Sequence, residues 1–265
     1  MSCCRRRAES ALNGVRRRST VNEVRVLGVL VDPGAHVRAA RLHGPAPGAR
    51  MVQRMPGQPS GDAAAADGVR HTDVVHGHGV AGALMTMMID SFLRQISIDD
   101  SSRDPARILK RLEEAIERTF GGKNEGSGVT TGLDIALLRC EPAKEQLHFA
   151  GAAMPLYMRE PTAETTTIRG RRKAIRNSHR KPPARFETVT VSTKGRLFFL
   201  LTDGYIDQPG GVEGRSYGTK RLKQFLESVD PERLDGSSAL WEMELSTYSE
   251  AEAQRDDILA LAFAL

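Results

Sequence analysis

Five short segments rich in β-branched or apolar residues follow one another in the second half of this chain of 265 residues, bounded by glycine, proline or polar residues. They are residues 132–139, 146–149, 156–159, 186–191 and 196–202. The pattern predicts strands, and short connections favour antiparallel pairing, because a parallel pair needs a long crossover. Apolar periodicity predicts helices at residues 80–93, 105–120, 219–228 and 237–248, and a closing strand at 257–264. The predicted fold class is α+β, a layered domain.

The first 70 residues have a composition of their own. They contain no Lys, Ile, Phe, Tyr or Trp and are rich in Arg, Ala, Gly and Pro; residues 24–31 are their one strand-like piece. Because such a segment packs poorly, we expect residues 1–72 to be a disordered or non-native leader. A shifted reading frame is one explanation, since the missing residues have mostly AT-rich codons. The domain would then span residues 73–265 and be incomplete at its N-terminal edge.

Charge and cysteine usage limit the class of protein. The formal net charge is +5, but basic residues concentrate in the first twenty residues and in residues 169–185, without interleaved aromatics. We therefore expect no nucleic-acid partner. Three cysteines form no CxxC pair, which indicates a reduced, cytoplasmic protein. No apolar stretch is long enough to cross a membrane, although a longer native form with a membrane anchor stays open.

Two aspartates adjoin apolar strands. Asp203 follows the apolar residues 197–201, and Asp256 stands just before the apolar residues 258–261. A carboxylate beside a buried strand loses hydration, so its ionised form needs hydrogen bonds or a cation. Converging carboxylates would hold Mg²⁺ or Mn²⁺. The alternative is structural: Asp203 belongs to a turn and Asp256 caps the entry to a strand.

Four ordered segments carry a resemblance to a known family. They are GHGVAGA at residues 77–83, TDG at 202–204, YG at 217–218 and DDI at 256–258. With them, residues 73–265 resemble the SpoIIE-type (RsbU-like) metal-dependent serine/threonine phosphatases, which are related to protein phosphatase 2C. Residues 151–155, 170–175 and 215–218 are similar to the biofilm-regulating SiaA branch.

The resemblance implies a β-sandwich of two antiparallel sheets flanked by helices, with two Mn²⁺ or Mg²⁺ ions at one edge. It implies hydrolysis of phosphoserine or phosphothreonine by a metal-bridging water, without a protein nucleophile. The implied substrate is a small phosphorylated regulatory protein of the anti-sigma-factor-antagonist type. Asp203 and Asp256 would be metal ligands. The residues that would surround the ligands are Asp257, Gly204, Gly77, His78 and Gly79.

The chain departs from the family at its first metal ligand. The resemblance places an Asp three residues before Gly77, where this chain has Val74; Asp73 is one position too far away. Because strand residues alternate between faces, Asp73 can serve only if a bulge absorbs one residue, and the backbone carbonyl of Val74 is the other candidate. The family's upstream Gly-Asp-aromatic segment has no counterpart here. We therefore predict missing or abnormal opening strands and weak turnover.

Three alternatives remain. An incomplete ligand set would leave a catalytically impaired binding module in a partner-switching pathway. The basic residues Arg171, Arg172 and Lys173 are candidates for substrate contact, or simply a solvated loop. His76 and His78 form a His-x-His pair of the kind that binds Zn²⁺, but neither His148 nor His179 has a suitable spacing to join them.

Overall fold

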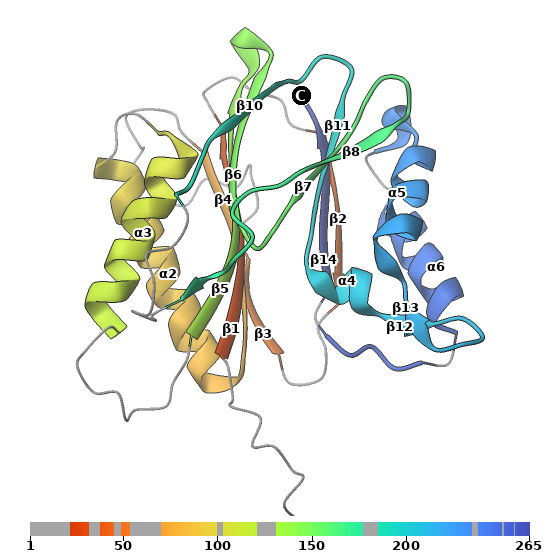
Figure 1. The fold of residues 1–265 in the computed structure, drawn as a ribbon, viewed down its shortest axis with the longest axis horizontal. Coiled ribbons are helices and arrows are strands. Elements are labelled where there is room, and N and C mark those ends of the chain that lie inside the picture. The colour runs from red at the N-terminus through yellow and green to blue at the C-terminus, as the bar shows by residue number, and fades with distance from the viewer. Residues whose placement is uncertain are drawn as a thin grey trace, which may run out of the picture.

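The structure is a computed structural model. It describes residues 22–31, 38–44, 49–53, 70–99, 103–120, 131–176, 185–234, 238–250, 252–256 and 258–265. Before Leu84 it describes the backbone alone. Two sheets stand face to face at the centre, and helices cover the outer face of each, which gives four layers (Figure 1).

The first sheet has seven strands in the order β10-β6-β5-β1-β4-β3, with β9 pairing to β5. Its strands are β1 (Asn22–Val31), β3 (Ala49–Gln53), β4 (Arg70–His78), β5 (Thr131–Glu141), β6 (Gln146–Ala152), β9 (Ile175–Arg176) and β10 (Val189–Ser192). All its pairs are antiparallel except β1 with β5.

The second sheet has five strands in the order β2-β14-β11-β7-β8, and all its described pairs are antiparallel. Its strands are β2 (Arg38–Gly44), β7 (Leu156–Arg159), β8 (Thr165–Ile168), β11 (Leu197–Leu201) and β14 (Ile258–Ala264). Every residue of β11 is buried, as expected for a central strand covered on both faces.

Helices form the two outer layers. On the first sheet lie α2 (Gly79–Asp99) and α3 (Pro105–Phe120), and on the second lie α5 (Gly218–Ser228) and α6 (Ser238–Ser249) (Figure 1). The short helix α4 (Asp203–Asp207) follows β11, and a small hairpin of β12 (Pro209–Gly210) and β13 (Arg215–Ser216) precedes α5. The 3-10 turns are η1 (Pro142–Lys144) and η2 (Pro231–Arg233). The predicted start of α3 is confirmed: the Asp104 carboxylate accepts the Arg107 N–H at 3.2 Å, next to Pro105.

Three buried clusters hold the layers together. Alternation along β5 separates two of them: Leu133, Ile135 and Leu137 pack against α2 and α3, whereas Ala136 and Leu138 pack between the sheets. The third cluster lies between the second sheet and α4, α5 and α6, and it buries five aromatic side chains among aliphatic ones. The predicted α+β sandwich of two sheets flanked by helices is confirmed.

Described strands from the N-terminal segment belong to both sheets, and the interpretation of residues 1–72 as a disordered or non-native leader stays a prediction. The strand β1 lies between β5 and β4 within the first sheet, β3 lies at the edge of that sheet, and β2 lies at the edge of the second. Backbone ladders need no aromatic or long aliphatic side chains, so a segment of Val, Arg and Ala can form strands within these sheets. That residues 1–72 come from a shifted frame stays a prediction.

Candidate metal centre

Asp203 is the first residue of α4 and is exposed. Because the buried strand β11 ends just before it, Asp203 lies at the end of the second sheet. An aspartate is favoured in the first turn of a helix. Thr202, 2% exposed, fixes this point: its Oγ1 accepts the Leu259 N–H at 2.9 Å, and its own N–H donates to the Leu259 carbonyl at 2.9 Å. The side chain therefore prolongs the ladder between β11 and β14.

Asp256 lies two residues before β14 and is half-buried. Because β11 and β14 are antiparallel, with Leu201 opposite Ala260, the end of β11 and the start of β14 coincide. The Gln254 amide donates to the Asp256 carbonyl at 2.8 Å and orders the approach to the strand. The structure thus brings Asp203 and Asp256 to one end of neighbouring strands. Asp257 lies outside the described residues.

The glycine-flanked motif reaches the same end of the sandwich. Gly77 and His78 end β4, and Gly79 begins α2. Gly44 at the end of β2 is opposite Ile258, and Ala49 at the start of β3 is opposite His78. Five peptide units join Gly44 to Ala49, a span of about 19 Å at most. The end of β4 and the start of β14 therefore lie toward the same end of the sandwich, in the lower part of Figure 1.

The register of β4 bears on the misplaced aspartate. The strand β1 lies between β4 and β5, so each of its residues pairs with one residue on either side. Asp73 and Leu137 pair with the same residue of β1, and Leu137 belongs to the helix-facing cluster. Val74 and Ala136 likewise pair with one residue of β1, and Ala136 belongs to the cluster between the sheets. Residues in one cross-strand row share a face, and the pairing of β4 with β1 runs from Arg70 to Gly77 without a bulge. Val74 therefore shares its cross-strand row with Ala136, and Asp73 shares its row with Leu137. The Asp73 carboxylate and the Val74 carbonyl stay untested as ligands.

One carboxylate at this end was missed by the sequence analysis. Asp134 on β5 is half-buried and lies on the same face of the strand as Ala136 and Leu138, which pack between the sheets. Its neighbour Leu133 is in register, through β1, with Gly77 at the end of β4. The signal was present in the sequence, because Asp134 interrupts an otherwise apolar strand as Asp203 ends one.

The donor set suits a hard cation better than zinc. Within the described residues, no three His, Cys, Asp or Glu side chains gather into a metal-binding group. Asp203 and Asp256 nevertheless supply two carboxylates at one end of the sheet. Mg²⁺ keeps several waters and needs one or two carboxylates, and Mn²⁺ also prefers oxygen ligands. The side chains of His76 and His78 lie outside the described residues, as does His179, and His148 Nδ1 instead lies 2.9 Å from Thr190 Oγ1.

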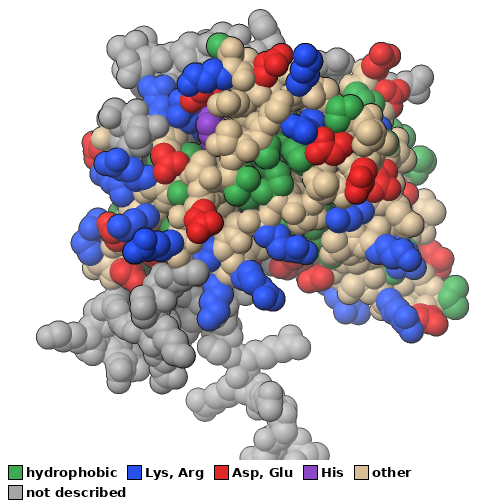
Figure 2. Space-filling view, turned by 45° about the horizontal axis from the view of Figure 1, so that its top comes forward, with side chains coloured by type: hydrophobic (Ala, Val, Ile, Leu, Met, Phe, Trp, Pro, Cys, Tyr) green, Lys and Arg blue, Asp and Glu red, His purple; other side chains and the backbone are tan. Residues whose placement is uncertain are grey.

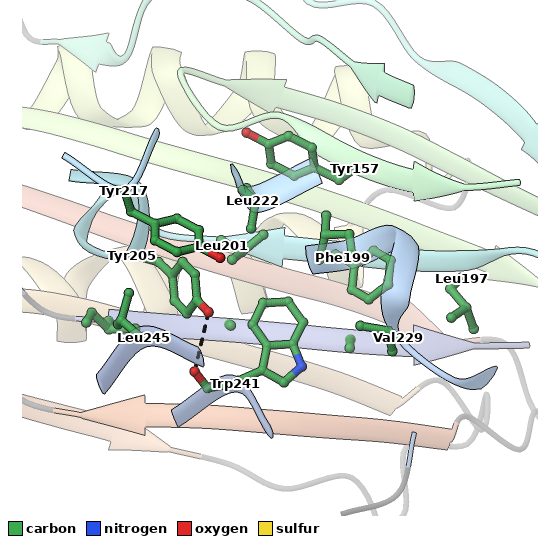
Figure 3. Packing of buried hydrophobic residues seen from close by; sticks show 14 of the residues in the cluster. Tyr157, Leu197, Phe199, Leu201, Tyr205, Tyr217, Leu222, Val229, Trp241 and Leu245 are labelled. Carbon is green, nitrogen blue, oxygen red and sulfur yellow. Dashed lines mark hydrogen bonds between the residues drawn. The ribbon is translucent and has the colours of Figure 1, made fainter. Parts of the chain in front are cut away.

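Aromatic side chains hold the segment that bears Asp203. Tyr205 is fully buried, with its ring edge-on to Tyr217 at 5.3 Å and to Trp241 at 5.6 Å. Its hydroxyl donates to the Trp241 carbonyl at 3.3 Å (Figure 3). Tyr217 donates in turn to Glu244 Oε1 at 2.6 Å. Burial above all, and the Glu244 carboxylate, raise the pKa values of Tyr205 and Tyr217, so both stay neutral donors.

Arg171 has a structural role in addition to its predicted role as a substrate contact, which stays a prediction. Its side chain is 2% exposed, pairs with Glu113 Oε1 at 2.7 Å and lies over the Phe186 ring at 4.0 Å. Its Nε also donates to the Lys173 carbonyl at 3.1 Å. Burial raises the pKa of Glu113 although Arg171 opposes the shift. These contacts attach the segment that bears Arg171 to α3.

The other two basic candidates remain accessible. Arg172 and Lys173 are exposed between Arg171 and β9, and β9 pairs with Gly132 and Leu133 at the start of β5. Since Leu133 is in register with Gly77, this basic segment lies toward the same end of the sandwich as the carboxylates.

Two face-to-face sheets between helix layers, with carboxylates at one end, define the protein phosphatase 2C class of phosphoprotein phosphatases. Residues 72–265 match the family model of Stage II sporulation protein E (SpoIIE), so the chain belongs to this family. The SiaA-PP2C domain of Pseudomonas aeruginosa is similar with a TM-score of 0.68 at 28% identity over 86% of each chain. The predicted family, near SiaA, is confirmed, and the chain is a phosphoprotein phosphatase domain.

More distant structures share the fold. The RsbU and RsbW domains of Rv1364c from Mycobacterium tuberculosis match with a TM-score of 0.55 at 17% identity, over 92% of this chain and 62% of that chain. The catalytic domain of PstP, solved with two manganese ions, matches with a TM-score of 0.50 at 16% identity, over 86% and 97%. Comparison with curated protein sequences gives no significant match. None of the helices in the described residues has the length and apolarity that a bilayer crossing requires.

Proposed function

We propose that this chain hydrolyses phosphoserine or phosphothreonine on a small regulatory protein and depends on Mn²⁺ or Mg²⁺. The observation that carries the proposal is the placement of Asp203 and Asp256 at one end of the paired strands β11 and β14. Gly77 and His78 end β4 at the same end of the sandwich. Within this family that combination supports an ion-dependent phosphatase site.

Two bound ions would supply an activated water and neutralise the charge that develops on the phosphoryl oxygens. The chain's own part is to hold carboxylates where they can ligate those ions. Asp203 and Asp256 are the proposed ligands, and Asp257, Gly204, Gly77, His78 and Gly79 the proposed surroundings. Small residues there let the backbone approach the reacting group closely.

The proposed partner is a small phosphorylated protein of the anti-sigma-factor-antagonist type. The match to a chain that combines RsbU and RsbW domains supports a partner-switching context. Arg172 and Lys173 are proposed contacts, because they are exposed and lie toward the carboxylate end. Over the face in Figure 2, by contrast, acidic and basic side chains are interspersed rather than gathered into one basic patch.

A second candidate is a phosphatase-like binding module with weak turnover. The specific observation in its favour is the unbroken register of β4, which puts Val74 in one cross-strand row with Ala136, at the position where the family resemblance places an aspartate. Fewer carboxylates bind a divalent ion less tightly. Recognition of the partner would then outlast catalysis.

Mn²⁺-dependent hydrolysis of a phosphoserine peptide and of p-nitrophenyl phosphate separates the two candidates. An active phosphatase should show Mn²⁺-dependent hydrolysis that falls by about 100-fold in Asp203→Asn, since even residues that only support ligands change metal affinity or activity by about 10–100-fold. The binding module should show slow hydrolysis at best. Asp99→Asn, an exposed aspartate on α2, is the control and should keep wild-type turnover.

Each outcome discriminates. Rapid hydrolysis that Asp203→Asn abolishes would contradict the impaired candidate. Hydrolysis that is insensitive to both Mn²⁺ and Asp203→Asn would contradict the proposed site.

A further inference from the structure

Gln208, just after α4, is a buried polar residue close to both proposed ligand segments. It is 2% exposed, and it follows Asp203 by five residues. Its Nε2 donates to the carbonyl of Ala253 at 3.3 Å and to that of Pro209 at 3.3 Å. Ala253 belongs to residues 252–256, which have no regular secondary structure and lead to Asp256. One side chain therefore joins the helix that begins with Asp203 to the approach to Asp256.

The main chain of Gln208 is fixed as well. Its carbonyl accepts the Tyr217 N–H at 2.9 Å, and the Tyr217 ring packs on Tyr205. The Gln208 amide is thus held by the aromatic layer and is aimed at residues 252–256. Thr202 ties the same two segments on their strand side through Leu259. Together Thr202 and Gln208 attach the Asp203 segment to the Asp256 segment at two points.

The Gln208 side chain is not optimised for stability alone. Its Oε1 is buried without a hydrogen-bond partner among the described residues. A buried acceptor that lacks a donor costs about 1–3 kcal/mol, so an apolar side chain of the same size would suit a purely structural position. Local rules of this kind are broken mainly at functional sites.

We propose that Gln208 is a positioning residue that sets the separation between the Asp203 and Asp256 carboxylates, and with it the affinity for Mn²⁺ or Mg²⁺. The inference rests on the proposed function, because it requires these aspartates to be ligands. Two attachment points restrain both the distance and the angle between two segments, whereas one attachment point restrains mainly the distance. A change in that angle weakens a site that depends on few carboxylates.

The test is Gln208→Met in the full chain, which conserves volume but removes both donated hydrogen bonds. Mn²⁺ binding is measured by titration calorimetry, and unfolding of the metal-free protein by thermal denaturation. Gln224→Met, an exposed glutamine on α5, is the matched control. We expect the Kd for Mn²⁺ to rise by about tenfold or more in Gln208→Met, with an unchanged metal-free Tm, and to stay at the wild-type value in Gln224→Met.

A second readout separates positioning from general destabilisation. In Gln208→Met, the Mn²⁺ dependence of p-nitrophenyl phosphate hydrolysis should move to higher concentration by the same factor, while turnover at saturating Mn²⁺ returns to the wild-type level. An unchanged Kd, a variant that fails to fold, or an equal shift in Gln224→Met would each overturn the inference. A wild-type chain that takes up no Mn²⁺ would contradict the proposed function itself, which is a distinguishable result.

Discussion

The two helix layers cover their sheets with different chemistry. The layer of α2 and α3 is aliphatic, built from Met, Ile, Leu and Ala with partly buried Phe side chains at its margin. The layer of α4, α5 and α6 buries Trp241, Tyr205 and Tyr217, and the Tyr205 ring meets the other two edge-on. The Tyr205 hydroxyl donates to the Trp241 carbonyl (Figure 3), and the Tyr217 hydroxyl donates to Glu244. Aliphatic contacts are non-directional, whereas edge-on rings and hydroxyl hydrogen bonds fix orientation.

This difference coincides with the placement of the proposed ligands. Asp203 and Gln208 flank the helix that carries Tyr205, and Asp256 follows α6, which carries Trp241. On the aliphatic side, the described buried ion pair of Arg171 with Glu113 holds the edge segment that leads to β9. We conclude that one layer mainly stabilises the sandwich, and that the other also orients the segments that bear the carboxylates.

The largest expected effect comes from truncating one large buried side chain in each helix layer. Trp241→Ala should lower the free energy of unfolding by about 3–5 kcal/mol, and Leu112→Ala by about 2–5 kcal/mol, because both side chains are buried. Urea unfolding measures the loss. Only Trp241→Ala should also raise the Kd for Mn²⁺ in titration calorimetry. Equal effects of the two substitutions on Mn²⁺ binding would contradict the proposal that only the layer of α4, α5 and α6 orients the segments that bear the carboxylates.

A smaller loss is expected when the ion pair of the aliphatic layer is broken. Arg171→Met leaves the half-buried Glu113 carboxylate without its cation, which should cost about 3 kcal/mol in urea unfolding. Glu114→Gln, on the exposed side of α3, is the control and should change stability by no more than about 0.5 kcal/mol. Matching results for the two variants would remove the structural role given to Arg171.

Tyr205→Phe tests the directional contacts alone. It keeps the ring but leaves the Trp241 carbonyl without its donor, so we expect a loss of about 1 kcal/mol in the free energy of unfolding. Ile108→Val in the aliphatic layer should cost a similar amount, about 0.5–1.5 kcal/mol. The sharper result is the Kd for Mn²⁺, which should rise in Tyr205→Phe and stay constant in Ile108→Val. A constant Kd in both would contradict an orienting role for the hydroxyl.

The smallest expected effect is on the pH dependence of stability. Burial holds the pKa of Glu113 above its ordinary value of 4.5, so its contribution to the free energy of unfolding falls as pH rises from about 4.5 through the raised pKa. Glu141, hydrogen-bonded to Lys144 and near Arg139, has a lowered pKa, so its contribution is present above pH 4.5 and is lost as pH falls through the lowered pKa.

Urea unfolding as a function of pH separates the two groups. Glu113→Gln should flatten the dependence above pH 4.5, and Glu141→Gln should flatten it below. If Glu113→Gln instead flattened the acid side, the dominance of burial over the Arg171 charge at Glu113 would be contradicted.

Local pattern was sufficient for the long elements of the fold. The cap at Asp104 and Pro105 and the helical repeat from Ile108 to Ile116 predicted α3, and the buried residues of α3 follow that repeat. The apolar segment before Asp203 and the one after Asp256 predicted β11 and β14. These signals lie within a few residues of one another, so a single turn or strand contains them.

Short elements and shared sites were beyond such patterns. The strand β8, the two-residue strand β9 and the five-residue helix α4 are too brief to show a period. The basic residues at 171–173 formed one group in the sequence, yet Arg171 is buried against Glu113 while Arg172 and Lys173 are exposed. Which member of a charged run turns inward depends on what the fold places opposite it.

The sequence by itself determined that Asp203 and Asp256 adjoin buried strands and that Val74 replaces an expected aspartate. Tertiary structure decided that the two strands are neighbours with coincident ends, that the β4 register passes Val74 without a bulge, and that Gln208 reaches Ala253 45 residues away. The physical reason is range. Apolar periodicity is set by the backbone within one element, whereas partners distant in the chain meet only after sheets and helices have packed.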